Sequence, residues 1–203
     1  MYRALVALAS RGDADFSHAT TFNLDEFLGL TPTHASSFRA FMNRHFFDLV
    51  NLAPSRINFL AGTPADAEME CDRYERAIEE AGGIDLLLLG LGTNGHIGFN
   101  EPGGTLVART HRVRLTQETR AANAALFNGD ERAVPAEALS MGMATILQVR
   151  AIVLLATGSA KARCVAGALR GPITPALPAS FLQLHPNVDV MLDDAAAEAW
   201  RRS

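Results

Sequence analysis

Apolar positions along the chain follow two periods, one typical of helices and one typical of buried strands. Residues 36–47 place apolar side chains about 3.6 residues apart, which predicts a helix. A second helix is expected to begin at Thr63-Pro64, with proline at the first helical position, and to end at Gly82-Gly83. Residues 1–10 have the pattern of an amphipathic helix, and an Ala-rich helix is expected to close the chain.

Short apolar runs between these stretches predict strands. We expect them at residues 19–24, 57–60, 84–89, 151–156 and 188–192. The run 84–89 (IDLLLL) is nearly all apolar, as in a strand that is buried on both faces of a parallel sheet. Strands that alternate with helices predict the α/β class, with an open, mostly parallel, doubly wound sheet and helices on both faces.

The start of the chain departs from this alternation, because a parallel α/β sheet usually opens with a strand. A βαβ unit takes about 30 residues or more, and only 18 residues precede the first predicted strand. We therefore expect a single domain over residues 1–203 that lacks its own first strand and is N-terminally incomplete. Residues 102–135, rich in Gly, Thr, Arg and Asn, are expected to form a mobile flap.

Composition narrows the class of protein. The 203 residues are 48% hydrophobic and 20% charged, as in globular proteins, which excludes a disordered chain. A net charge of −4 disfavours nucleic acid and anionic membranes as partners. No apolar run approaches the roughly 20 residues that span a bilayer. Two distant cysteines, Cys71 and Cys164, argue against a disulfide scaffold, so a reducing cytoplasm is the expected compartment.

Polar residues follow several of the predicted strands, and the carboxyl ends of parallel strands meet at one edge of a sheet. Asp25-Glu26 follow 19–24, a Gly-rich segment GLGTNGHIGFNEPGG follows 84–89, and Gly158-Ser159-Ala160-Lys161 follows 151–156. Their convergence predicts one ligand site.

The Gly-rich segment is either a turn that binds no ligand or a functional loop, and for the functional loop there are two interpretations. Residues 90–95 match the dinucleotide pattern GxGxxG, but the two glycines and the proline that come next argue against the helix such a site needs. The alternative is catalysis by side chains in this turn. His96 can carry a proton near neutral pH, Glu101 can orient its imidazole, and Asn94 can hold a substrate hydroxyl or carbonyl.

Two further groups fit a sugar-phosphate reaction. Asp25 is a candidate base for removing a proton next to a carbonyl, and one of Asp25 and Glu26 should face the site. The helix that begins near Gly158 and Ser159 offers N–H groups to an anion, and Lys161 adds a positive charge. Metal-ligand spacing and the motifs HExxH and GxSxG are absent from the sequence, so no metal is expected.

These residues carry a family resemblance. GLGTNGHIGFNEPG, the flanking TFNLDEF, the ATGSAKA turn and the segment SFLQLHPN are similar to the glucosamine-6-phosphate deaminase family, over essentially the whole chain. The related 6-phosphogluconolactonases share the fold and a Gly-His turn but do not usually continue with FNEP.

The resemblance implies conversion of glucosamine 6-phosphate into fructose 6-phosphate and ammonia, with no redox cofactor. By position, Asp25 would move the proton between C2 and C1 through an enolamine, and His96 would assist opening of the pyranose ring. Glu101 and Asn94 would set the charge and orientation of His96, and Lys161 would contact the phosphate.

Three departures from the family pattern bear on this. The family's Gly- and Thr-rich phosphate loop lies upstream of the helix at residues 1–10. Some members place a phosphate-binding Arg where this chain has Ala124-Ala125-Leu126. His111 and Val113 stand where allosteric members have Arg and Lys, so allosteric activation is not expected. Homo-oligomerisation is left open.

Two other functions remain as alternatives. A 6-phosphogluconolactonase-like hydrolase would use His96 to activate water and would have little need for Asp25 as a carbon base. An inactive sugar-phosphate-binding protein would keep the fold without the chemistry.

Overall fold

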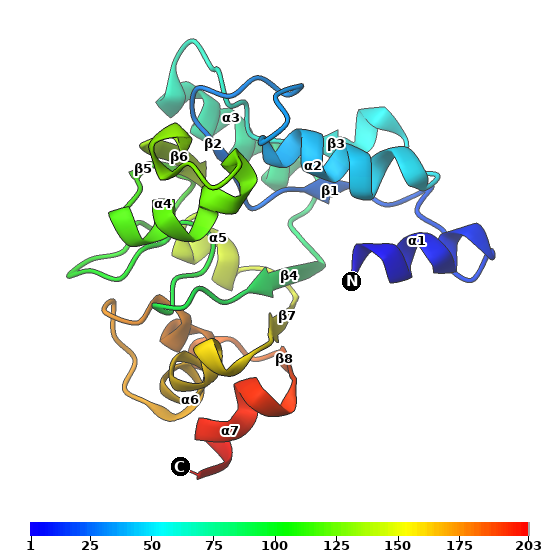
Figure 1. The fold of residues 1–203 in the computed structure, drawn as a ribbon. Helices are drawn as coiled ribbons and strands as arrows, with labels where there is room; N and C mark the ends of the chain where they lie inside the picture. Colours follow the sequence, from blue (N-terminus) through cyan, green and yellow to red (C-terminus); the bar gives the residue numbers. More distant parts are fainter. Residues whose placement is uncertain (203) are drawn as a thin grey trace. The chain divides into compact units, whose positions relative to one another are not determined.

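The computed structural model describes residues 1–202, which form two compact units. The first unit comprises Met1–Ala81 and Arg114–Leu139, and the second comprises Gly82–Val113 and the residues from Ser140 onward. Helices alternate with short strands in both, so the predicted α/β class is confirmed (Figure 1). Within residues 1–202, no helix is long and apolar enough to cross a bilayer.

The second unit is built on a parallel sheet of three strands, ordered β4-β7-β8. These strands are β4 (Leu86–Gly90), β7 (Ala151–Ala156) and β8 (Val188–Leu192), and the last two coincide with the predicted runs. Helices α6 (Ala162–Arg170) and α7 (Asp194–Arg202) follow β7 and β8 and lie side by side (Figure 1). A short helix α5 (Met143–Leu147) precedes β7.

The two faces of this sheet differ in exposure. Leu87 and Leu89 of β4 and Ile152 of β7 point to one face and are at most 5% exposed. On the other face, Leu86 is 54% and Met191 is 56% exposed. The prediction that residues 84–89 are buried on both faces is therefore wrong, because an all-apolar run does not reveal whether a second layer covers it.

The first unit pairs β1 (Thr21–Phe22) with β3 (Ile57–Asn58) in parallel. A further sheet has the order β2-β6-β5 and contains β2 (Asp25–Phe27), β5 (His111–Arg114) and β6 (Glu137–Ser140). The predicted strand 19–24 is thus replaced by two shorter strands, and Asp25 lies in the second of them instead of after a strand.

The helices of the first unit are α1 (Tyr2–Ser10), α2 (Phe38–His45), α3 (Ala67–Glu80) and α4 (Gln117–Asn123). Helix α3 begins later than predicted, because the Asp66 side chain and not Thr63 caps it, accepting the N–H groups of Glu68 and Met69. Residues 102–135 hold β5, α4 and two 3₁₀ turns, so the segment predicted to be a flap contains regular structure.

A cluster of buried residues on α2 and the turn after it anchors the N-terminal helix. Met42, Phe46 and Phe47 are at most 7% exposed, and Tyr2 and Leu5 of α1 pack against them. The ring centroids of Tyr2 and Phe46 are 5.6 Å apart. Aromatic burial of this kind contributes a large part of the stability of a small unit.

Candidate active site

The Gly-rich segment after β4 forms a tight loop, with no helix between residues 91 and 110, in agreement with the argument against a dinucleotide site. The N–H of Gly92 donates to the carbonyl of His96 at 2.9 Å, and the N–H of Gly95 donates to the carbonyl of Gly92 at 3.1 Å. Gly95 has a φ of +88°, which glycine adopts without strain. A side chain at position 92 would collide with the imidazole of His96. Gly92 therefore allows the His96 imidazole to lie close to the backbone, and Gly95 allows the loop to turn.

This loop brings three predicted side chains together. The Nδ1 atom of His96 lies 3.7 Å from Oε2 of Glu101, and the same oxygen accepts the Nδ2–H of Asn94 at 3.3 Å. The Asn94 Oδ1 atom accepts the N–H of His96 at 3.1 Å. Both side chains of the His96–Glu101 pair are largely shielded, with 19% and 10% exposure. This arrangement can hold an imidazole in one orientation beside a carboxylate.

Asn100 stabilises the same loop, and the sequence argument did not single it out. Its side chain is 2% exposed and donates to the carbonyls of Ile97 at 3.0 Å and Met141 at 2.8 Å. The neighbouring N–H of Phe99 donates to the Ser140 hydroxyl at 3.1 Å. The position of Asn100 between Phe99 and Glu101 gives no local sign of burial, but a buried Asn normally has hydrogen-bond partners, as this one does.

The predicted anion-binding turn follows β7 in the same unit. Gly158 has a φ of +87°, and a 3₁₀ turn, Ser159–Lys161, leads into α6. The Gly158 N–H donates to both carboxylate oxygens of Asp193, at 3.0 and 2.9 Å. Lys161 is partly buried, which lowers the pKa of its ammonium group. Ser159 is exposed.

One contact joins this turn to the Gly-rich loop. The thiol of Cys164, on the first turn of α6, donates to the carbonyl of Thr93 at 2.6 Å. Lys161 therefore precedes a helix that is tied to the loop carrying Asn94 and His96. Within residues 1–202, no three His, Cys, Asp or Glu side chains are grouped as metal ligands would be.

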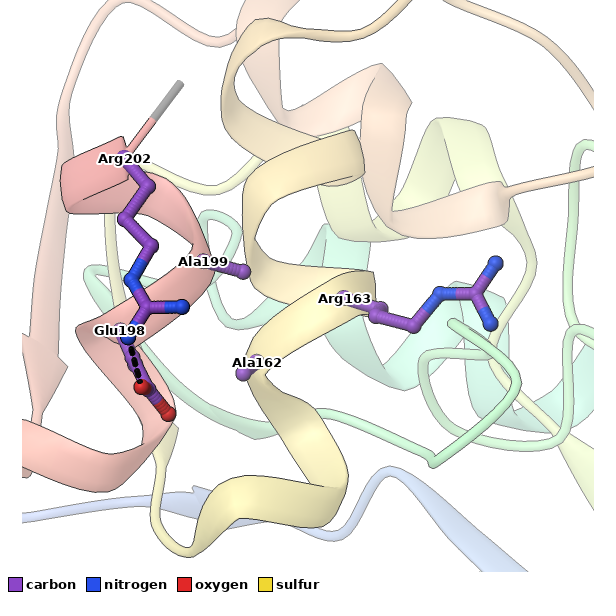
Figure 2. Close-up of a pocket in the computed structure, with 5 residues that line it drawn as sticks. All are labelled: Ala162, Arg163, Glu198, Ala199 and Arg202. Atoms are coloured by element: carbon purple, nitrogen blue, oxygen red, sulfur yellow. Dashed lines mark hydrogen bonds and ion pairs between the residues drawn. The ribbon is translucent and has the colours of Figure 1, made fainter.

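The second unit also has an open pocket of about 440 Å³ between α6 and α7. Arg163, Glu198 and Arg202 are among its lining residues, and Glu198 pairs with Arg202 at 2.6 Å. Figure 2 shows that the Arg163 side chain extends away from this pair. None of the predicted site residues lines this pocket.

Asp25 and Glu26 belong to the first unit, where they meet different surroundings. Burial, with a smaller contribution from the charge of Glu26, raises the pKa of Asp25 to about 7. Glu26 is 2% exposed, and its carboxylate accepts the N–H groups of Phe27, Phe38 and Arg39 at 2.8, 3.1 and 2.9 Å. Burial raises the pKa of Glu26 as well, but its carboxylate is taken up by N–H groups at the start of α2. Asp25, with a pKa of about 7, is therefore the candidate for proton transfer at neutral pH.

Comparison with known proteins adds independent information. Residues 1–191 match the family described as glucosamine-6-phosphate isomerases/6-phosphogluconolactonase. A glucosamine-6-phosphate deaminase of Rhodopirellula baltica is 52% identical over 196 residues, which are 97% of this chain and 78% of that protein. Glucosamine-6-phosphate deaminase 2 of Giardia intestinalis is 49% identical over 97% of this chain and 74% of that protein.

Two solved structures differ in how similar they are to this chain. A monomeric glucosamine-6-phosphate deaminase has a TM-score of 0.93 and 43% identity, covering 98% of this chain and 82% of that one. The 6-phosphogluconolactonase of Thermotoga maritima has a TM-score of 0.71 at 18% identity, covering 94% of this chain and 79% of that one. The second likeness is one of fold alone.

Proposed function

The chain belongs to the glucosamine-6-phosphate isomerase/6-phosphogluconolactonase family, and from this premise we propose that it converts glucosamine 6-phosphate and water into fructose 6-phosphate and ammonia. The observation that carries the proposal is the difference in similarity within the family. The sequence is 52% identical to a deaminase, in a match that covers 97% of this chain. It is 18% identical to a lactonase of the same fold.

The chemistry divides into proton transfers that the named side chains can perform. His96, oriented by Glu101 and Asn94, assists opening of the pyranose ring and so exposes the C1 aldehyde. Asp25 removes the C2 proton to give an enolamine and returns a proton to C1, which leaves an imine at C2. Water then adds to the imine carbon, and the C–N bond breaks to release ammonia. The overall conversion needs no external oxidant or reductant, so no redox cofactor is required, and the proton transfers are left to these side chains.

In this proposal, the turn after β7 binds the phosphate of the substrate. Lys161 supplies the positive charge and Ser159 a hydroxyl, while the N–H of Gly158 is already bonded to Asp193. Gly158 would then shape the turn through its positive φ instead of donating to the phosphate. Binding energy from a remote phosphate can hold C1 and C2 in place for the transfer.

The proposal also covers the reaction class, the metabolic role and the cellular compartment of the enzyme. It would act as a hydrolase of a C–N bond and an isomerase in carbohydrate metabolism, in amino-sugar catabolism and N-acetylglucosamine degradation, in the cytoplasm. The sugar phosphate would be its partner, without nucleic acid or membrane. A single domain over residues 1–203 stays a prediction. A homo-oligomer is compatible with the proposal but not required by it.

The deciding experiment offers the purified chain glucosamine 6-phosphate and, separately, 6-phosphogluconolactone. We expect ammonia and fructose 6-phosphate from the first and no accelerated hydrolysis of the second. Asp25→Asn should lower the rate by about 10²–10⁴-fold and abolish exchange of the C2 proton with solvent deuterium. Lactone hydrolysis without ammonia release would favour the lactonase alternative, and binding without turnover of either substrate would favour an inactive binding protein.

A further inference from the structure

A pocket of about 530 Å³ lies wholly within the first unit, apart from every residue assigned a catalytic role above. Its walls come from α2, from β3 and the segment that follows it to Gly62, and from the first half of α3. Volumes of about 300–1,000 Å³ are usual for sites that bind small molecules. The pocket is therefore large enough for a metabolite-sized ligand.

Arg39 of α2 is the unmatched cation of this pocket. Its guanidinium carbon lies over the rings of Phe47 and Phe59, 5.7 and 5.6 Å from their centroids. The side chain is half-buried. Across residues 1–202 it has no carboxylate partner and its guanidinium makes no hydrogen bond. The aromatic contacts hold the group in place, and its fork of N–H donors remains available.

The other charged residues of the pocket already have partners. Arg73 pairs with Glu70 at 2.6 Å and donates to the carbonyl of Phe59 at 3.1 Å. The oxygens of Glu26 accept three backbone N–H groups at the start of α2. A guanidinium fork matches a carboxylate or a phosphate by two parallel hydrogen bonds.

The remaining lining residues offer polar and apolar contacts to the organic part of a molecule that carries such a carboxylate or phosphate. Asn43, one turn after Arg39 on α2, adds an amide, and Thr33 adds a hydroxyl. Leu30, Ile57 and Leu60 provide apolar surface. We propose that this pocket binds a small organic molecule bearing a phosphate or carboxylate, which Arg39 recognises. The site also involves Glu26, the residue after Asp25 on β2.

The first test measures binding of inorganic phosphate and of acetate by calorimetry, using the full chain with Lys161→Met. That background removes the positive charge proposed to bind the substrate phosphate, so anion binding at Arg39 is measured separately from the proposed function. Arg39→Met keeps the stem that packs on the rings and removes the fork. We expect it to weaken binding by roughly ten- to a hundredfold, the usual effect of losing a hydrogen bond to a charged group. Arg44→Met, on the exposed side of the same helix, should leave binding unchanged.

A second measurement does not require any variant to fold. Phenylglyoxal modification of the unaltered chain is followed by peptide mass spectrometry with and without phosphate or acetate. Either anion should slow modification of Arg39 and not of Arg44. The proposal fails if neither anion binds saturably, if Arg39→Met binds as tightly as Arg44→Met, or if both arginines are protected equally.

Discussion

At the scale of single residues, the adjacent carboxylates of β2 show how neighbouring positions acquire different chemistry. Burial raises the pKa of both carboxyl groups, that of Asp25 from 3.8 to about 7. Three backbone N–H groups bind the Glu26 carboxylate and oppose the rise in its pKa. Ionisation of Asp25 therefore destabilises the folded state, whereas ionisation of a solvated aspartate would not. The same shift makes Asp25 a suitable base near neutral pH.

Replacing Asp25 by Asn should stabilise the protein in a pH-dependent way. A folded pKa above the unfolded one means that the folded state binds the proton more tightly, so stability falls as pH rises from 3.8 through about 7. The uncharged variant escapes this loss. We expect its unfolding free energy to match the parent near pH 4 and to exceed it by about 1–2 kcal/mol at pH 8, a discounted value because the side chain is only half-buried.

Urea titrations at several pH values measure this difference, while Asp48→Asn controls for loss of a negative charge at an exposed position. A gain that is the same at every pH, or that also appears in the Asp48 variant, would contradict the assigned pKa of Asp25.

The residues of the candidate site differ in how far the sequence could predict them. The grouping of Asn94, His96 and Glu101 followed from a Gly-rich turn after an apolar run, and the structure brings them within hydrogen-bonding or ion-pair range. The positioning contacts of Asn100 and Asp193 were missed. The contacts of Asn100 with Met141 and of Asp193 with Gly158 join residues 41 and 35 positions apart, which local patterns do not reveal.

At the scale of elements, two turns of the second unit are tied together by one side chain. Asp193 follows β8 and accepts the N–H of Ala196 in the first turn of α7 at 2.8 Å, as a helix cap does. Its carboxylate also accepts the N–H of Gly158. The turn that carries Lys161 is thereby anchored to the start of a neighbouring helix.

Asp193→Ala should therefore affect stability and substrate binding together. Losing the cap should lower the unfolding free energy by about 1 kcal/mol, and a looser Lys161 turn should raise KM for glucosamine 6-phosphate more than it changes kcat. The matched control is Asp194→Ala, because Asp194 makes only an exposed ion pair with Arg201. Thermal unfolding and steady-state kinetics measure both effects. Equal changes in the two variants would show that the tie between the turns has no consequence.

At this scale, the strands whose sequence is dominated by buried apolar residues were the ones that the sequence predicted well. Residues 151–156 (AIVLLA) are a continuous apolar run and residues 188–192 (VDVML) are apolar except for Asp189, and the bounds of both strands were predicted correctly. The strands β2 (DEF) and β5 (HRVR) are short and rich in charge, so they carry no alternating apolar signal. Helix α3 was found but its start was misplaced, because an Asp cap three residues further on competes with Thr63-Pro64.

At the scale of the whole molecule, a modest net charge is combined with an exposed apolar sheet face. The chain carries −4 at neutral pH. On β4-β7-β8, the register places Leu86 beside Ala151 and Leu88 beside Val153, and Met191 continues the same face. Leu86 and Met191 are more than half exposed. The exposed Asp189 also lies on this face, beside Val153, so the apolar side chains surround one charge. Exposed groups of apolar side chains favour association between molecules.

Adjacent leucines of β4 offer a matched test of which face is exposed in solution. Leu86→Lys places a charge on the exposed face and should reduce concentration-dependent association in light scattering, with little change in Tm. Leu87→Lys puts the same charge into the core, where Leu87 is 5% exposed. It should unfold the second unit, because an unpaired buried ammonium costs several kcal/mol. If both variants lost stability equally, Leu86 would be covered in solution. If association stayed unchanged in Leu86→Lys, another surface would be responsible for it.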